Sequence, residues 1–331
     1  FLIFDGGVRQ DCFLVMDELG EWITIGVFQQ DLDSGDSSLL LECLKILFGS
    51  CEANNYSLIL WDHGSAWVND SAYKKEITSR AIAFDDTSKH AISTADLRKA
   101  LEDFSTQTGK RINLLGMDAC LMGSIEVLYE LRDIVDYVVA SSFTVPGDGY
   151  DYVFFKQIVS TDGAVGLGRK IVDTFKDYYD TSSYWKQKGL SLAVYDMSKV
   201  ESTAFWVDSL AKRLVEMMDN DLRNTVGNFY PSLAKYNNNN DDNLLVDLND
   251  FAHYTQSIGD RDVQDYAQKI QNVLAELIVY EYVEKTNYEI QNPVSIFMPN
   301  KKDVMLKYRA DYETLSFFQI RWFNFLESWL E

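Results

Sequence analysis

A histidine and a cysteine occupy similar positions in the chain, each just after an apolar run. His63 directly follows the apolar run YSLILWD at residues 56–62, and Cys120 comes shortly after a second run, INLLGM, at residues 112–117. A thiolate is a strong nucleophile, and a nearby imidazole can accept and donate protons. The pair predicts nucleophilic attack on a carbonyl. The alternative is a structural histidine at a strand end and an inert buried cysteine.

The elements before these residues should bring them to one edge of a sheet. Both apolar runs lack polar alternation, which is typical of parallel strands covered on both faces. In an open α/β sheet, functional groups gather beyond the carboxyl ends of the strands. Because neighbouring strands lie roughly 5 Å apart, we expect His63 and Cys120 to face each other across a short gap.

The backbone around the pair suits the same chemistry. We expect Cys120 to open a helix over residues 121–132, whose N-terminus would lower the pKa of the thiol. The N–H groups of Gly64 and Cys120 are the expected donors to an oxyanion. Of the other histidines, His90 lies in a polar stretch and His253 in a helix-like one, so we expect both to be structural or solvated.

Acidic residues follow the same strand ends. Asp62 precedes His63, Asp118 precedes Cys120, and Asp148 follows a further apolar run. Desolvated carboxylates need partners, and a positively charged substrate side chain would supply one. The equally weighted alternative is that these residues cap loops and helix starts. A metal site is less favoured because no histidine or cysteine ligand has suitable spacing.

Strand-like and helix-like segments alternate over the first 200 residues. This alternation predicts a three-layer α/β/α domain with a mostly parallel central sheet. The expected strands cover residues 56–62, 112–117, 137–142 and 190–196. The expected helices cover residues 36–48, 94–104, 121–132 and 167–179. Ser93 and Asp96 form a capping-box pattern at the start of the second helix.

Helices dominate the second part of the chain, over residues 200–219 and 263–280. One late strand, at residues 294–298, is expected to return to the sheet. We therefore expect a catalytic domain over residues 1–200 and a mainly helical extension over residues 201–331 packed against it. The chain opens on a strand-like FLIFDGG, which suggests a mature or trimmed terminus.

The composition narrows the classes of partner. The 331 residues include 30 Lys and Arg against 51 Asp and Glu, a net charge of −21, which argues against nucleic acid or an anionic membrane as partner. No run approaches 18 apolar residues, so no transmembrane helix is expected. Four cysteines without metal-binding spacing do not make a disulfide scaffold.

Around the proposed site the sequence resembles the clostripain family of cysteine peptidases, bacterial relatives of caspases, gingipains and legumain. The resemblance covers nearly the whole chain. It rests on WDHGSAW at residues 61–67, MDACLMG at 117–123, SSFTVPGDGYDY at 141–152, DLNDF at 247–251 and PVSIFMP at 293–299. Where the family commonly has WDHGSGW, this chain has Ala66. Family members also usually have another strand and helix before the point where this sequence begins.

The resemblance implies a caspase-like sandwich and a thiol protease with His63 and Cys120 as its dyad. It implies cleavage after Arg or Lys in proteins or peptides, with Asp118 and Asp148 in the specificity pocket. It also implies self-cleavage in the loop after His63, at one of three basic residues. These candidates are Lys74, Lys75 and Arg80.

No cofactor is expected for the chemistry itself. Some relatives depend on calcium, and acidic stretches at residues 31–36 and 237–243 offer oxygen ligands for a structural or activating ion. We expect a monomer, present as two chains after processing, and export to the periplasm, the cell envelope or the medium. Two alternatives are a catalytically silent caspase-like binding module and a thiol amidase or transpeptidase that uses the same dyad.

Overall fold

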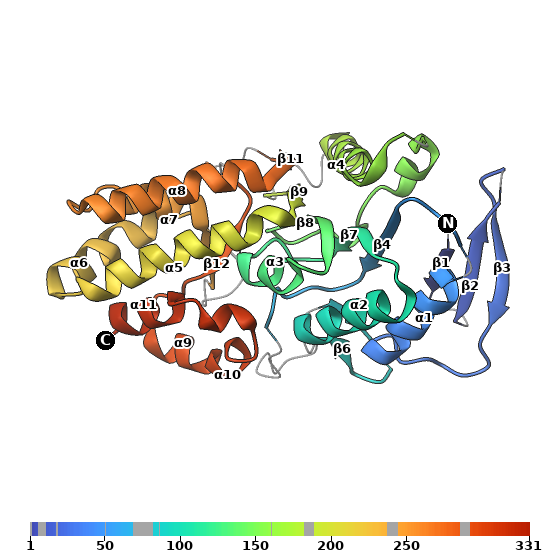
Figure 1. The fold of residues 1–331 in the computed structure, drawn as a ribbon, viewed down its shortest axis with the longest axis horizontal. Coiled ribbons are helices and arrows are strands. Elements are labelled where there is room, and N and C mark those ends of the chain that lie inside the picture. The colour runs from blue at the N-terminus through green and yellow to red at the C-terminus, as the bar shows by residue number, and fades with distance from the viewer. Residues whose placement is uncertain are drawn as a thin grey trace.

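A five-stranded sheet forms the centre of the molecule, with its strands in the order β11-β9-β8-β7-β4 (Figure 1). In chain order these strands are β4 (Tyr56–Trp61), β7 (Ile112–Asp118), β8 (Val135–Ala140), β9 (Ser191–Asp196) and β11 (Ile278–Val283). The structure is a computed structural model. It describes residues 2–5, 11–17, 19–49, 51–68, 82–85, 87–159, 161–181, 189–236, 244–284 and 292–331.

The sheet is mixed rather than mostly parallel. Strand β7 pairs in parallel with β4 and β8, whereas β9 is antiparallel to both β8 and β11. Every residue of β9 except the last is buried. The sequence therefore predicts this strand correctly but not its direction, because burial on both faces makes a strand apolar whichever way it runs.

Helices cover both faces of the sheet, which confirms the predicted three-layer α/β/α fold. Side chains alternate along the strands, so that Leu114 and Val194 pack in one core while Leu115 and Ala193 pack in the other. Helix α4 (Gly163–Thr181) and the 3₁₀ helix η1 (Tyr152–Gln157) contribute to the first core. The second core receives α2 (Thr94–Thr108), α3 (Ile125–Leu131) and α5 (Val200–Glu216).

Local capping signals set the helix starts. Ser93 Oγ accepts a hydrogen bond from the N–H of Asp96 at 3.1 Å, so the predicted cap of α2 is confirmed. The cap of α3 is Ser124, and this helix begins at Ile125 rather than at residue 121. Helix α1 (Ser37–Gly49) packs beside α2 and matches the helix predicted over residues 36–48.

The second half of the chain contributes a strand whose first residues, 278–280, the sequence analysis assigned to a helix. Helix α8 (Arg261–Leu277) ends before residue 280, and β11 follows at once and joins the central sheet. The late strand β12 (Ser295–Phe297) exists, but it pairs with β10 (Leu245–Asp247) in a separate two-stranded sheet. The prediction that it returns to the central sheet is therefore wrong.

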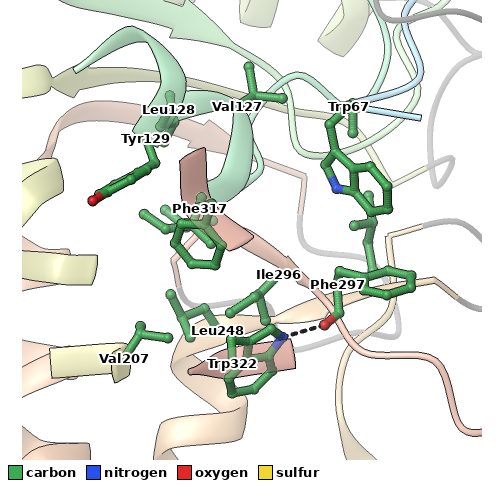
Figure 2. Close-up of a cluster of buried hydrophobic side chains, with 14 of the residues drawn as sticks. Trp67, Val127, Leu128, Tyr129, Val207, Leu248, Ile296, Phe297, Phe317 and Trp322 are labelled. Atoms are coloured by element: carbon green, nitrogen blue, oxygen red, sulfur yellow. Dashed lines mark hydrogen bonds between the residues drawn. The ribbon is translucent and has the colours of Figure 1, made fainter. Parts of the chain in front are cut away.

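The remaining helices surround an aromatic core that is continuous with one face of the central sheet. Figure 2 shows part of it, where the indole of Trp322 donates a hydrogen bond to the carbonyl oxygen of Phe297 at 2.5 Å. The helices are α6 (Asn220–Phe229), α7 (Leu248–Thr255), α9 (Lys302–Lys307), α10 (Arg309–Tyr312) and α11 (Trp322–Trp329), with 3₁₀ helices η2 (Met197–Lys199), η3 (Tyr230–Ser232) and η4 (Ser316–Gln319).

Two smaller sheets complete the fold. The opening strand is found as β1 (Leu2–Asp5), which forms an antiparallel sheet with β2 (Cys12–Met16) and β3 (Trp22–Val27). A hairpin of β5 (Ile82–Phe84) and β6 (Ala91–Ile92) lies between β4 and α2 in the sequence. In the described ranges, no helix has both the length and the apolar character to cross a membrane.

Candidate active site

The carboxyl ends of β4 and β7 meet as the sequence predicts. Trp61 pairs in parallel register with Asp118, and the N–H of Asp62 donates to the carbonyl oxygen of Asp118 at 3.3 Å. His63 and Cys120 each follow this paired level by two positions, so their backbones leave the sheet at the same edge. The prediction that these two strands are parallel neighbours is confirmed.

Gly64 brings the histidine and cysteine segments into direct backbone contact. A Cβ atom at this position would lie 2.5 Å from the carbonyl oxygen of Cys120 and 2.9 Å from its nitrogen. No real Cβ approaches other atoms so closely, so only glycine fits here without a shift of the backbone. The two N–H groups proposed as oxyanion donors, those of Gly64 and Cys120, therefore belong to backbone segments that touch.

The two side chains are placed differently. The imidazole of His63 is exposed, whereas the thiol of Cys120 is partly buried and faces the loop after β8. Its sulfur accepts a hydrogen bond from the N–H of Val145 at 3.2 Å and lies 3.6 Å from the carbonyl oxygen of Val145. Among the described residues, no hydrogen bond joins the imidazole to the thiol. Catalytic hydrogen bonds often tighten only when substrate binds.

The electrostatic setting of Cys120 differs from the prediction. Burial raises the pKa of the thiol, the negative charge of Asp118 raises it further, and the hydrogen bond from Val145 opposes both effects. The lowered pKa expected from a helix N-terminus does not arise, because α3 begins only at Ile125. The thiol therefore needs a base to become a nucleophile, and the imidazole of His63 is the group placed at the same edge.

The backbone turns sharply after the cysteine. Leu121 has a φ angle of 65°, in the left-handed region that an L side chain reaches at a cost of about 1–2 kcal/mol. Its N–H donates to the carbonyl oxygen of Phe143 at 2.9 Å. Such a conformation persists only where the surroundings hold it, and it is common at functional sites.

Asp118 is a buried carboxylate whose two oxygens differ in their hydrogen bonding. Its side chain is 1% exposed, and Oδ2 accepts hydrogen bonds from the N–H of Tyr150 at 2.8 Å and the hydroxyl of Tyr152 at 3.0 Å. Within the described structure, the other oxygen, Oδ1, is buried and has no hydrogen-bond partner. Burial is the main cause that raises the pKa of Asp118 to about 6, and the two donors oppose it.

Asp148 lies on the loop that covers Asp118. It is exposed and accepts a hydrogen bond from the hydroxyl of Tyr178 at 3.1 Å. The next residue, Gly149, has a φ angle of 66°, and a Cβ atom there would lie 2.5 Å from Oδ2 of Asp118. One loop thus joins the two acidic residues that the sequence analysis placed in a specificity pocket. The third, Asp62, accepts the backbone N–H of His63 at 2.6 Å.

Other predicted positions fall outside this edge. The self-cleavage candidates Lys74, Lys75 and Arg80, and the acidic stretch at residues 237–243, lie outside the described residues. His90 binds the carboxylate of Asp33. His253 is exposed on helix α7, at the surface of the second half of the chain.

In the acidic stretch at residues 31–36, two carboxylates already make hydrogen bonds within the protein. Asp33 is already bonded to Ser88 and His90, and Asp36 accepts the N–H of Ser38 at 2.8 Å. Within the parts of the chain that are described, no three acidic, histidine or cysteine side chains come together as metal ligands.

Sequence reasoning missed Val145 and Tyr152. Val145 holds the sulfur through its main chain, which any residue could do, so its type carries no signal. Tyr152 donates to Asp118, and the only hint was its place at the end of the motif that contains Asp148.

The chain forms an α/β/α sandwich in which a cysteine and a histidine follow two adjacent parallel strands. This arrangement is typical of a caspase-like fold with a thiol site. A model of the clostripain family matches residues 1–329, and the chain belongs to this family. Clostripain of Hathewaya histolytica is 26% identical over 339 residues, which cover 90% of this chain and 63% of that protein. The chain thus spans less than two thirds of the length of this relative.

Solved structures of two C11 proteases have a similar fold. A secreted C11 cysteine protease from Bacteroides thetaiotaomicron, in complex with an irreversible peptide inhibitor, has a TM-score of 0.72 and 17% identity, covering 97% of this chain and 87% of that one. An inactive zymogen C11 protease from Parabacteroides distasonis has a TM-score of 0.67 with the same identity and coverage. At this identity the likeness concerns the fold.

Proposed function

We propose that this chain is a cysteine endopeptidase that cleaves after Arg or Lys. The observation that carries the proposal is the edge formed by β4 and β7, where His63 and Cys120 leave the sheet together beside the buried carboxylate of Asp118. Membership of the clostripain family supports the peptidase chemistry. Oδ1 of Asp118, which has no hydrogen-bond partner among the described residues, supports the preference for a cation.

In the proposed reaction, His63 takes the proton of the Cys120 thiol as the sulfur attacks the substrate carbonyl carbon. The N–H groups of Gly64 and Cys120 stabilise the oxyanion. His63 then donates its proton to the leaving amine as the C–N bond breaks, which leaves an acyl group on the sulfur. Finally His63 removes a proton from water, and the water oxygen attacks the acyl carbon. The C–S bond breaks, the acid leaves, and His63 returns the proton to the sulfur of Cys120.

The choice of substrate follows from the desolvation of Asp118. Its carboxylate is buried away from water, and among the described residues only one of its oxygens receives hydrogen bonds. A guanidinium or ammonium group would supply the missing charge and hydrogen bonds, whereas a neutral side chain would leave the carboxylate unpaired. Asp148, exposed on the covering loop, adds attraction at the entrance.

Processing, export and assembly complete the proposal. We propose that the chain cleaves itself after Lys74, Lys75 or Arg80 and remains a monomer of two fragments. The zymogen described for the similar protease from Parabacteroides distasonis supports an inactive precursor. The secreted relative from Bacteroides thetaiotaomicron supports export.

The test uses small arginyl and lysyl amides with the purified chain. We expect turnover that disappears in Cys120→Ala but persists in Cys51→Ala, which removes an exposed thiol elsewhere. Unchanged turnover in Cys120→Ala would falsify the assignment of the nucleophile. Transfer of the acyl group to added amines in place of water would indicate a transpeptidase, and binding without turnover would indicate a binding module. A parallel assay with chelator tests calcium dependence.

A further inference from the structure

The loop between Cys120 and helix α3 is fixed by partners from both halves of the chain. On one side, the N–H of Gly123 donates to the carbonyl oxygen of Ser141 at 2.8 Å, next to the bond from Leu121 described above. On the other side, the N–H of Ser295 in β12 donates to the carbonyl oxygen of Gly123 at 3.2 Å. The backbone that carries Cys120 thus lies between the segment that follows β8 and strand β12.

Two buried hydroxyl groups join these partners. Ser142 Oγ lies 2.9 Å from the carbonyl oxygen of Gly123 and 2.5 Å from that of Pro293. The hydroxyl of Tyr195, in β9, donates to the same carbonyl of Pro293 at 2.5 Å. Neither residue is exposed. Because each hydroxyl has one proton, the arrangement that satisfies both carbonyls has Tyr195 donating to Pro293 and Ser142 donating to Gly123.

Gly123 is the residue that permits this contact. A Cβ atom here would lie 2.5 Å from Ser142 Oγ and 2.7 Å from the hydroxyl of Tyr195. The close approach lets the hydroxyls reach a main chain that already contains the left-handed Leu121. Without them, the carbonyls of Gly123 and Pro293 would be buried beside each other with fewer donors, which is costly.

We propose that Ser142 and Tyr195 are positioning residues for the nucleophile. Their hydrogen bonds hold the Cys120 loop against the segment that leads into β12. The second half of the chain thereby helps to fix the position of the thiol. Because the loop is held in this way, the sulfur of Cys120 stays beside the N–H of Val145, and that N–H stabilises the thiolate form of Cys120. The inference rests on the proposed function for its kinetic test, but its chemical test needs only the thiol.

The variants are Ser142→Ala and Tyr195→Phe, each of which removes one hydroxyl. The matched control is Tyr230→Phe, because Tyr230 is also buried and donates to a carbonyl just beyond β12, that of Met298, at 3.0 Å, away from the loop. Alkylation by iodoacetamide is followed at Cys120 by peptide mass mapping across a pH series. The exposed Cys51 serves as the reference thiol in each sample.

We expect the alkylation profile of Cys120 to move to higher pH in both variants, while that of Cys51 stays unchanged. With basic amide substrates we expect kcat to fall about tenfold, as loss of a positioning hydrogen bond would cause, and KM to change less than twofold. The control should match the wild type in both measurements.

The outcomes separate the two proposals. If the wild type cleaves no substrate, the proposed function fails, but the alkylation profiles still decide whether the loop is locked. If one variant does not fold, as judged by thermal unfolding, the other decides. Profiles and kcat values that match the wild type, or that change equally in Tyr230→Phe, would overturn the positioning role.

Discussion

Two buried carboxylic acids, Asp118 and Glu126, accept the same kinds of hydrogen bond but lie in different surroundings. In each, a single oxygen accepts hydrogen bonds from one backbone N–H and one tyrosine hydroxyl. The donors are Tyr150 and Tyr152 for Asp118, and Phe297 and Tyr312 for Glu126. Burial is the main cause that raises the pKa of both groups, to about 6 in Asp118 and about 7 in Glu126.

The difference lies in what surrounds each group. Asp118 ends a strand beneath a loop whose tip, including Asp148, is exposed. Glu126 lies on α3 between β12 and α10, inside the aromatic core of which Figure 2 shows the neighbouring Val127 and Phe297. A buried carboxylate with a raised pKa therefore does not mark a binding site by itself. We propose that such a carboxylate marks a binding site only where an exposed segment lies beside it, as at Asp118, so that a ligand can reach it.

We expect the largest effect from a substitution at Asp118, which tests whether this carboxylate, unlike Glu126, binds the substrate. Asp118→Asn keeps the shape and removes the charge, so we expect kcat/KM for arginyl substrates to fall about a thousandfold, as when one member of a buried pair is lost. The measurement is the ratio of kcat/KM for arginyl substrates to kcat/KM for neutral substrates. Asp148→Asn, at an exposed position, should lower the same ratio by less than tenfold. Equal losses for arginyl and neutral substrates would remove Asp118 from the pocket.

A smaller effect concerns the stability linked to Glu126. Its pKa rises on folding from 4.5 to about 7, so the folded state holds the proton more tightly. The resulting stabilisation is complete below pH 4.5 and is lost as the pH rises through 7, by at most about 3 kcal/mol. Urea unfolding at pH 5 and pH 8 should show this loss in the wild type and a flatter response in Glu126→Gln.

The substrate selectivity of Glu126→Gln tests whether Glu126, unlike Asp118, has no contact with the substrate. Because the side chain is enclosed, the ratio of arginyl to neutral cleavage should match that of the wild type. A changed ratio would show that Glu126 also reaches the substrate, and the contrast with Asp118 would disappear.

The smallest effect is expected at Tyr152. Tyr152→Phe removes a hydroxyl that donates to Asp118, so the pKa of this carboxyl should rise further. We expect KM for an arginyl amide to increase about threefold at pH 6 and less at pH 8, where the carboxyl stays charged. Tyr178→Phe removes the matching donor of the exposed Asp148 and serves as control. A pH-independent change in KM would mean that Tyr152 acts through shape alone.

Much of the site could be predicted because its signals are local. Apolar runs at residues 56–62 and 112–117 identify two buried strands, and the residues just after them must leave at the sheet edge. The capping pattern at Ser93 likewise fixes the start of α2 within a few residues. The motifs around His63 and Cys120 then indicated the family that the whole-chain match shows.

Other features could not be predicted because they depend on contacts between distant segments. Residues 278–280 belong to the segment predicted as a helix, yet pairing with β9 places them, with the rest of β11, in the central sheet. The start of α3 lies later than expected because the chain after Cys120 bonds to the segment beyond β8 and to β12 instead of continuing as a helix. Local propensity is weak compared with such tertiary contacts.

The sequence by itself determined which residues could do the chemistry and which strand ends carry them, since residue type and hydrophobic period are properties of short segments. Only the tertiary structure decided the electrostatic state of these groups. The thiol of Cys120 has a raised pKa, and one oxygen of Asp118 has no hydrogen-bond partner in the part of the chain that the structure describes. Both follow from burial and from the positions of Val145, Tyr150 and Tyr152, which are set by folding. Desolvation depends on everything that surrounds a group, and no short stretch of sequence contains that information.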